Sequence, residues 1–261
     1  MSVLEARAVS FTYPDGTRAL AEVSVAVEHG EIVAVLGPSG AGKSTLFKCF
    51  AGLERPTAGQ VVVEGTDLAT LRGKALRLAQ HRIGLVFQEF HLVGRASVLS
   101  NVLVGRLATA NPVTSLVHWM SRADRTVAVE LLTRVGLSEQ VRKRADSLSG
   151  GQRQRVAVAR ALSQQPELLL ADEPVANLDP VLAAGVIDDI VRMVREEGLT
   201  AVLNLHDVTL ARRVAQRIVG MREGRVMFDL PVAEVTDAIL ADLYANEGLA
   251  ADAAAREEVA A

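Results

Sequence analysis

The sequence is short of cysteine, of aromatic residues and of long apolar runs, and each shortage excludes a class of protein. Cys49 is the only cysteine among 261 residues, so no disulfide can form within the chain, which fits a reducing compartment. No run approaches the roughly 18 to 20 apolar residues that a membrane-spanning helix needs, and Met1 to Arg7 lacks the apolar core of a signal peptide. We therefore expect the chain itself to stay in the cytoplasm.

Charge and aromatic content argue against a nucleic-acid partner. The 28 basic and 31 acidic residues are dispersed, and only 3% of residues are aromatic, whereas nucleic-acid binding needs clustered Lys and Arg or stacking aromatics. With 49% hydrophobic residues and a net charge of −3, the chain is predicted to be a soluble globular α/β protein with an ample core.

The most informative segment fits the phosphate-binding pattern G-x-x-x-x-G-K-[ST] and follows a strand-like run at 32–36, which is the context the pattern requires. Glycine has no Cβ, so backbone N–H groups can surround triphosphate oxygens at close range. Lys43 would contact the β- and γ-phosphates, and Ser44 would offer its hydroxyl to magnesium. The predicted nucleotide-binding residues of this loop are Gly37, Pro38, Ser39, Gly40, Ala41, Gly42, Lys43, Ser44 and Thr45.

The acidic pair Asp172-Glu173 is the second predicted part of the site. The apolar run 168–171 before it is typical of a buried parallel strand, and ligands bind at the carboxyl edge of such a sheet. Asp172 would hold magnesium through water, and Glu173 would act as the general base on the attacking water. An acidic turn that merely ends a strand is the alternative, and the phosphate loop argues against it.

Alternating strand and helix patterns predict an α/β fold with a mainly parallel sheet. Strands are predicted at 6–13, 19–27, 61–63, 82–87, 168–171 and 200–205, and helices at 151–163 and 182–196. Helical spacing at about 89–147 predicts an inserted helical subdomain. A nucleotide-binding core is therefore expected at about 1–88 and 148–230 of a single domain at 1–245, followed by a short Ala/Glu-rich tail at 246–261.

The segment Leu148-Ser149-Gly150-Gly151-Gln152 is the signature of ATP-binding-cassette (ABC) ATPases, and the chain resembles that family from about Val3 to Pro231. The resemblance implies a P-loop NTPase (RecA-like) core with a mainly parallel sheet, an antiparallel β subdomain and the helical insert. It also implies an ATPase with ATP and Mg²⁺ as cofactors.

The resemblance assigns roles to further residues. Tyr13 resembles the aromatic residue that stacks on adenine, Gln88 the catalytic glutamine that senses magnesium and the attacking water, and His206 the switch histidine on the γ-phosphate. Five residues resemble those that complete the ATP site of the opposite subunit: Ser149, Gly150, Gly151, Gln152 and Asp179.

These residues imply partners. The signature opens a helix whose N-terminus forms a second anion site, and the family uses it to hold two chains together as a homodimer around ATP. Chromosome-maintenance relatives carry a very long coiled coil between the phosphate loop and the signature, and translation-factor relatives carry two cassettes in one chain. In this chain each motif occurs once and the insert is small, so the motor of a transporter is the favoured interpretation. Such a motor binds transmembrane permease subunits from other chains and lies peripherally on the cytoplasmic face of the membrane.

Residues 87–105 resemble the ATPase of phosphonate importers, which implies an extracytoplasmic binding protein for phosphonates, and sometimes for phosphate or phosphite. Glu89 and His91 depart from that pattern, where Gln and Asn are expected, beside the expected permease contact. The alternatives are an importer for amino acids or metal chelates, an exporter motor of the lipoprotein or macrolide type, and a non-transport regulatory ATPase.

Overall fold

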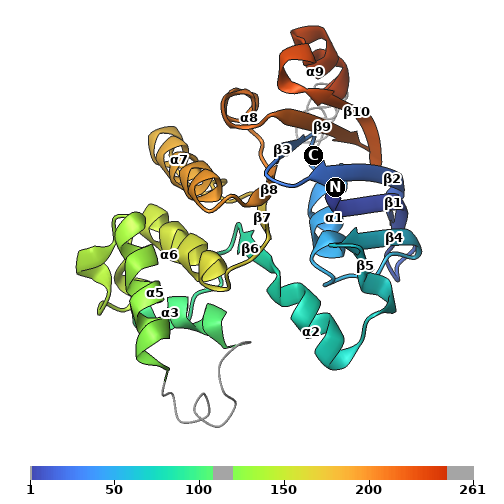
Figure 1. Cartoon of the computed structure of the whole chain (residues 1–261). Helices are drawn as coiled ribbons and strands as arrows, with labels where there is room; N and C mark the ends of the chain where they lie inside the picture. Colours follow the sequence, from blue (N-terminus) through green and yellow to red (C-terminus); the bar gives the residue numbers. More distant parts are fainter. Residues whose placement is uncertain (1, 108–119, 246–261) are drawn as a thin grey trace, which may run out of the picture.

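Runs rich in valine, isoleucine and leucine form the strands of two adjacent sheets (Figure 1). The structure, a computed structural model, describes residues 2–107 and 120–245. One sheet is antiparallel, with the order β2-β1-β4-β5. Its strands are β1 (Ser2–Thr12), β2 (Arg18–Glu28), β4 (Ala58–Val63) and β5 (Thr66–Asp67).

The second sheet has the order β10-β9-β3-β8-β7-β6 and is parallel except at β10, which runs antiparallel to β9. Its strands are β3 (Ile32–Leu36), β6 (Ile83–Phe87), β7 (Leu168–Asp172), β8 (Thr200–Asn204), β9 (Arg217–Arg222) and β10 (Arg225–Pro231). The helices are α1 (Lys43–Phe50), α2 (Gly73–His81), α3 (Val98–Leu103), α5 (Arg122–Arg134), α6 (Gly150–Ser163), α7 (Pro180–Glu196), α8 (Val208–Val214) and α9 (Asp237–Leu243).

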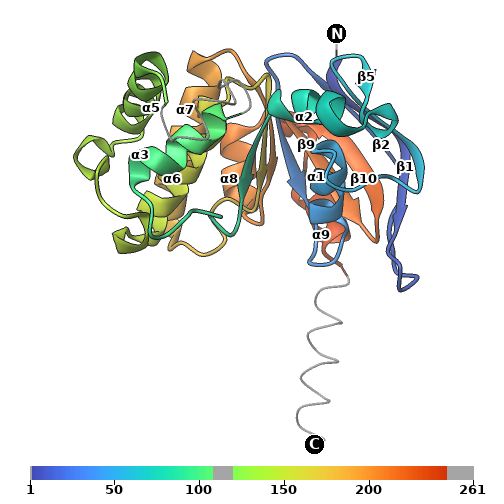
Figure 2. The ribbon, with the colours of Figure 1, turned by 90° about the horizontal axis from the view of Figure 1, so that it is seen from below.

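The central strands are buried on both faces, which accounts for their continuous apolar runs. Alternate residues face two different clusters. Leu170 and Val202 join the cluster that contains α1 and the antiparallel sheet, whereas Leu169 and Leu203 join the cluster that contains α6 and α7. Figure 2 shows this layering, with α6 and α7 on one side of the parallel sheet and α1 on the other. Because β7 and β8 are parallel neighbours, their carboxyl ends, at Asp172 and Asn204, lie at the same edge of the sheet.

The predicted α/β class with a mainly parallel sheet is confirmed, together with the antiparallel β subdomain. The helix expected from residue 182 begins earlier, at Pro180, because Asp179 caps it and proline suits the first helical position. The sequence patterns do not predict α2, which has no buried residue, nor the elements α8, β9, β10 and α9.

The described part of the expected insert is helical, and α3 and α5 pack on α6. Residues 108–119 of the insert and the expected tail at 246–261 lie outside the described residues. Within 2–107 and 120–245, none of the helices combines the length and the apolar character that crossing a membrane requires.

Candidate nucleotide site

The loop between β3 and α1 has a backbone that only glycine allows at two positions. Gly37 has φ 148° and Gly42, which precedes α1, has φ 95°. A Cβ on Gly37 would lie 2.0 Å from the carbonyl oxygen of Met221, and one on Gly42 would lie 2.4 Å from that of Ala19. The first turn of α1 contains no acidic residue, so its backbone N–H groups form an anion site.

Lys43 carries the positive charge of this loop. Its side chain is buried, and Nζ donates to the carbonyl oxygens of Gly37 at 2.7 Å and Pro38 at 2.9 Å. The ammonium group therefore lies inside the loop, where it can contact phosphate oxygens. Of the other predicted loop residues, Ser39 and Gly40 are exposed, and Ala41 and Thr45 are buried.

The two predicted magnesium ligands from distant parts of the chain meet in the fold. Ser44, on the first turn of α1, donates from Oγ to Oδ1 of Asp172 at 3.1 Å. Magnesium prefers oxygen ligands, and it commonly takes one or two carboxylates together with phosphates of the substrate. A hydroxyl and a carboxylate beside a phosphate loop fit this ion.

Gln88, the third predicted ligand, is placed less closely. It follows β6 directly, and β6 pairs with β7 so that Phe87 lies opposite Asp172. The Gln88 side chain is exposed, and among the described residues none makes a hydrogen bond to its amide. The structure therefore places Gln88 at the edge of the sheet where β7 ends, without a hydrogen bond to Ser44 or Asp172.

Glu173 and His206 are brought together although 33 positions separate them in the sequence. Nε2 of His206 lies 2.7 Å from Oε1 of Glu173, whose side chain is 20% exposed. Glu173 has φ 50°, which is uncommon for a residue with a Cβ, and its N–H donates to the carbonyl of Asn204 at 3.2 Å. The turn after β7 thus aims the carboxylate at the histidine that follows β8.

Tyr13 lies beside the phosphate helix. Its hydroxyl shares a hydrogen bond of 2.9 Å with Oγ1 of Thr45, and its ring meets the ring of Phe11 edge to face with centroids 4.9 Å apart. The half-buried ring is therefore fixed next to the loop, as a base-stacking residue requires.

The signature residues form a second group. Ser149 caps α6 through a reciprocal pair of bonds with Gln152, so the Gln152 side chain is used in the cap. Asp179 caps α7, accepting from the N–H of Leu182 at 3.1 Å. A Cβ on Gly150 would lie 3.1 Å from Leu178, so the two helix starts are neighbours. The bonds of Ser149, Gln152 and Asp179 named above lie within the starts of α6 and α7.

Sequence reasoning missed Asn204, a fully buried residue whose Nδ2 donates to Oδ1 of Asp172 at 2.6 Å. An amide at the end of the apolar run 201–203 was a signal that could have identified it, because buried polar groups need partners.

Sequence reasoning also missed a clasp on the segment after Gln88. Arg160 of α6 donates to the carbonyl oxygens of Phe90 at 2.9 Å and His91 at 2.6 Å, and burial lowers its pKa from the ordinary value. The guanidinium of Arg153 lies 4.9 Å from the centroid of the Phe90 ring. The signature helix therefore holds the segment that begins at Gln88.

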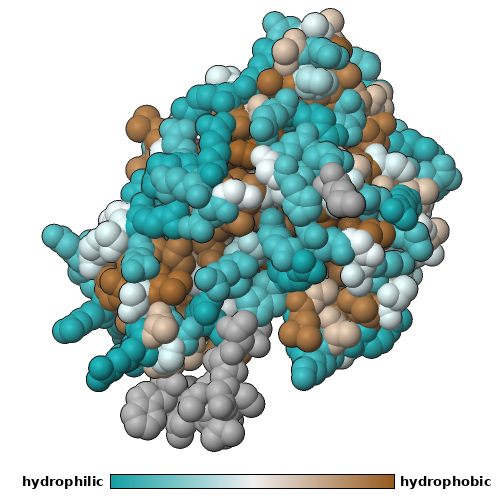
Figure 3. Space-filling model, in the orientation of Figure 1, coloured by the Kyte–Doolittle hydropathy of each residue, from teal (hydrophilic) through white to brown (hydrophobic). Residues whose placement is uncertain are grey.

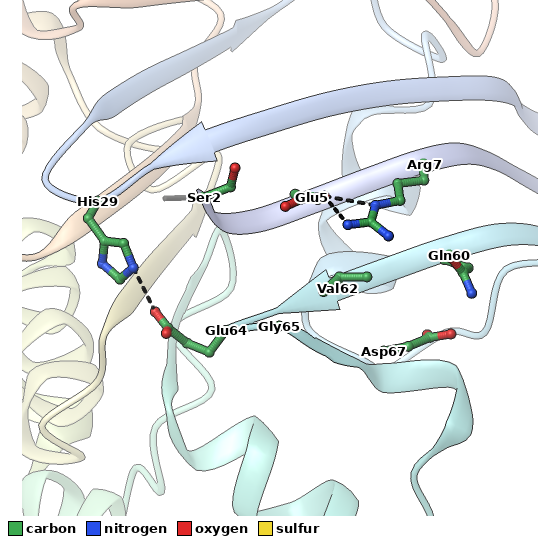
Figure 4. A pocket seen from close by; sticks show the side chains of 9 residues that line it. All are labelled: Ser2, Glu5, Arg7, His29, Gln60, Val62, Glu64, Gly65 and Asp67. Carbon is green, nitrogen blue, oxygen red and sulfur yellow. Dashed lines mark hydrogen bonds and ion pairs between the residues drawn. The ribbon is translucent and has the colours of Figure 1, made fainter.

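A separate pocket lies on the antiparallel sheet, and Figure 4 shows its lining side chains. Its ionisable side chains have partners: His29 lies 3.2 Å from Glu64, Arg7 bonds to Glu5 at 2.8 Å, and Asp67 accepts from the N–H of Ala69 at 2.9 Å. Within the described ranges, no group of three or more His, Cys, Asp or Glu side chains is arranged to hold a metal ion. This pocket gives no indication of a ligand.

Comparisons with known proteins agree with the geometry. A profile of the family described as "ABC transporter" matches residues 20–176. The phosphonates import ATP-binding protein PhnC 1 of Rhodopseudomonas palustris is 49% identical over 235 residues, covering 90% of this chain and 84% of the relative. PhnC 2 of Halalkalibacterium halodurans is 43% identical over 242 residues, covering 93% and 99%.

Two solved structures are also similar. One is a dimeric post-hydrolysis state of the ATP-binding cassette MJ0796 bound to ADP and Pi, with a TM-score of 0.78 and 31% identity over 88% of this chain and 98% of that one. The other is cbiO1 from Clostridium perfringens, part of the ABC transporter complex cbiONQ, with a TM-score of 0.79 and 30% identity over 98% and 99%.

Proposed function

The chain belongs to the ABC transporter family, and we propose that it is the ATP-hydrolysing subunit of a phosphonate importer. The observation that carries the substrate is similarity to relatives named for phosphonate import, at 43% and 49% identity over at least 90% of the chain. Phosphate and phosphite are included in the proposal as further substrates. The chemistry is supported by the meeting of the phosphate loop, Asp172 and Glu173 at one sheet edge.

The residues divide the work on ATP. The loop amides and Lys43 would bind the phosphates, Tyr13 would stack on adenine, and Ser44, Asp172 and Gln88 would hold magnesium. Magnesium, when bound, neutralises charge on the phosphates.

Glu173 would take the proton from the attacking water while His206 fixes the carboxylate through its bond to Oε1. Because that bond uses Oε1, the second carboxylate oxygen can face the water. ATP would be cleaved to ADP and phosphate in this step.

The working unit in this proposal is a homodimer. The signature group, with Ser149, Gly150, Gly151, Gln152 and Asp179, lies at two helix starts apart from the phosphate loop, so each ATP site needs the signature of a second copy. A symmetric pair satisfies both sites at once, since C2 interfaces are self-complementary. The dimeric state of MJ0796 supports this arrangement.

The dimer would act at the cytoplasmic face of the membrane on transmembrane permease subunits. An extracytoplasmic binding protein would capture the phosphonate for the permease and so would be an indirect partner of the dimer. Figure 3 shows apolar side chains exposed among the helices at the left of the view. Leu99, Leu103 and Met120 line a hollow in the helical region together with Val104 and Leu107, which are each 47% exposed. We assign the described part of this helical region, at 89–107 and 120–147, to permease contact, and it includes the exposed residues Glu89 and His91.

Uptake of isotope-labelled phosphonate and phosphate, compared between cells with the native chain and with Glu173→Gln, tests the function. Loss of phosphonate uptake alone supports the narrow proposal, and joint loss supports a wider phosphorus-oxyanion importer. Unchanged uptake of both contradicts the substrate assignment. Copurification of a permease with the chain from membranes tests the transport role separately from the substrate.

A further inference from the structure

Asn204 is a polar side chain in a place that excludes water. It ends β8, is fully buried, and follows the apolar residues 201–203 of the strand. Burial of an amide is unfavourable unless the amide is hydrogen-bonded. The bond that Asn204 makes is therefore the reason to look for its role.

The sheet register puts Asn204 directly beside Asp172. The two residues are partners in the parallel pair β7 and β8, so both side chains point to the same face of the sheet. The residues two positions earlier, Leu170 and Val202, belong to the cluster that contains α1. Asn204 and Asp172 therefore lie on the side of the sheet that faces the helix carrying Ser44.

A single oxygen of the Asp172 carboxylate accepts hydrogen bonds from both Asn204 and Ser44. Oδ1 of Asp172 accepts from Nδ2 of Asn204 at 2.6 Å and from Oγ of Ser44 at 3.1 Å. Among the described residues, none donates to Oδ2. Two donors on one oxygen fix the rotation of the carboxylate and leave Oδ2 as the oxygen that can face a hydrated ion.

The backbone of Asn204 also contacts Glu173, the residue that follows Asp172. Its carbonyl oxygen accepts from the N–H of Glu173 at 3.2 Å, at the point where the chain takes the left-handed conformation with φ 50°. A single residue thus contacts the expected magnesium ligand with its side chain and the expected base with its main chain.

We propose that Asn204 is a positioning residue that orients Asp172 toward the metal of the nucleotide site. The amide is suited to this role because it donates to a carboxylate without adding charge in a buried place. The proposal rests on the proposed metal role of Asp172. Partners of this kind around metal ligands typically change metal affinity by about 10- to 100-fold when removed.

The test measures metal binding and not turnover. In the full-length Glu173→Gln chain, which should not consume ATP, binding of Mn²⁺ in the presence of ATP is followed by electron paramagnetic resonance. Asn204→Leu keeps the branched shape of the side chain and removes the donor. We expect roughly a 10- to 100-fold loss of Mn²⁺ affinity, with unchanged ATP affinity when the metal is removed by chelation.

Two further variants make the result specific. Val202 lies on the same strand and the same face but is paired with Leu170 and not with Asp172, so Val202→Ala should lower the melting temperature and leave Mn²⁺ affinity unchanged. Asp172→Ala should lose Mn²⁺ binding. If Asn204→Leu does not fold, Asn204→Ala, which only removes atoms, is measured in its place by the same criteria.

The outcomes separate the inference from the function it rests on. Loss of Mn²⁺ affinity in Asp172→Ala but not in a folded Asn204 variant overturns the role of Asn204 alone. Unchanged affinity in Asp172→Ala overturns the metal site itself.

Discussion

Oε1 of Glu173 and Nε2 of His206 lie 2.7 Å apart, although the two residues follow different strands of the parallel sheet. The contact exists because β7 and β8 are neighbours in register, so that the residues following Asp172 and Asn204 emerge at the same edge. In the proposed function, this carboxylate, held by an imidazole, would accept a proton from the attacking water.

Glu173→Gln should reduce ATP turnover by about 10²- to 10⁴-fold, because proton-transfer assistance typically contributes that much. ATP binding should be retained, since the loop amides and Lys43, whose Nζ lies inside the loop, are the groups expected to hold the phosphates. Phosphate release measures turnover, and equilibrium dialysis measures binding. Glu139→Gln is the matched control, because Glu139 is exposed and lies in the short helix Ser138–Gln140, outside the predicted nucleotide site. Equal turnover in native chain and Glu173→Gln would show that another group is the base.

Lys43→Ala should act on binding and not on the chemical step alone. The ammonium lies inside the loop, and a hydrogen bond to a charged group is typically worth about 1.5 to 3 kcal/mol, so nucleotide affinity should fall by roughly 10- to 100-fold. Titration with a fluorescent ATP analogue measures the change. Lys48→Ala, on the same helix but exposed, should bind as the native chain does. Equal affinity of the two variants would remove Lys43 from the phosphate site.

The contrast between these residues and Asn204 indicates which parts of the site can be predicted from the sequence. The phosphate loop could be predicted because its residues are contiguous and lie between a strand and a helix, as observed. The apolar run before Asp172 likewise predicted the buried strand β7. The bond from Asn204 to Asp172 depends on which strands are neighbours, and no local pattern contains that information.

The missed helix and strands have a similar cause. No residue of α2 is buried, so a short amphipathic segment is all that the sequence offers at 73–81. The antiparallel pairing of β9 with β10 turns at Glu223 and Gly224, both with positive φ, after only short apolar runs. Packing against the rest of the sheet decides such elements.

Ser149→Arg should prevent the ATP-dependent dimer. In the Glu173→Gln chain with ATP and magnesium, sedimentation should give a dimer, because unhydrolysed ATP would be held between the phosphate loop of one copy and the signature of the other. In the double variant Ser149→Arg/Glu173→Gln, the large cation at the start of α6 should keep the protein monomeric. Each chain should still bind ATP at its own phosphate loop. A chain carrying Glu173→Gln alone that stayed monomeric at high concentration would contradict the homodimer.

Arg160→Ala should loosen the segment after Gln88. The variant loses two charged hydrogen bonds to the carbonyl oxygens of Phe90 and His91, each typically worth about 1.5 to 3 kcal/mol. Hydrogen exchange at residues 88–92 should become faster, and the free energy of unfolding should fall. Arg195→Ala, at an exposed position on α7, serves as the control. Unchanged exchange in this segment would mean that the clasp does not hold it in solution.

Cys49 gives a prediction on pH. Burial raises the pKa of its thiol from 9.0 to about 12, with a smaller contribution from the negative charge of Glu54. Between these values the unfolded chain loses a proton that the folded chain keeps, so stability should fall as pH rises through 9 toward 12. At pH 10 the loss of unfolding free energy amounts to about 1.4 kcal/mol. Chemical unfolding at pH 8 and pH 10 measures this loss against Cys49→Ala, which should lack this part of the pH dependence.

Thiol reagents at pH 8 should label the folded chain far more slowly than the unfolded one. Rapid labelling of the folded chain would show that the thiol is accessible.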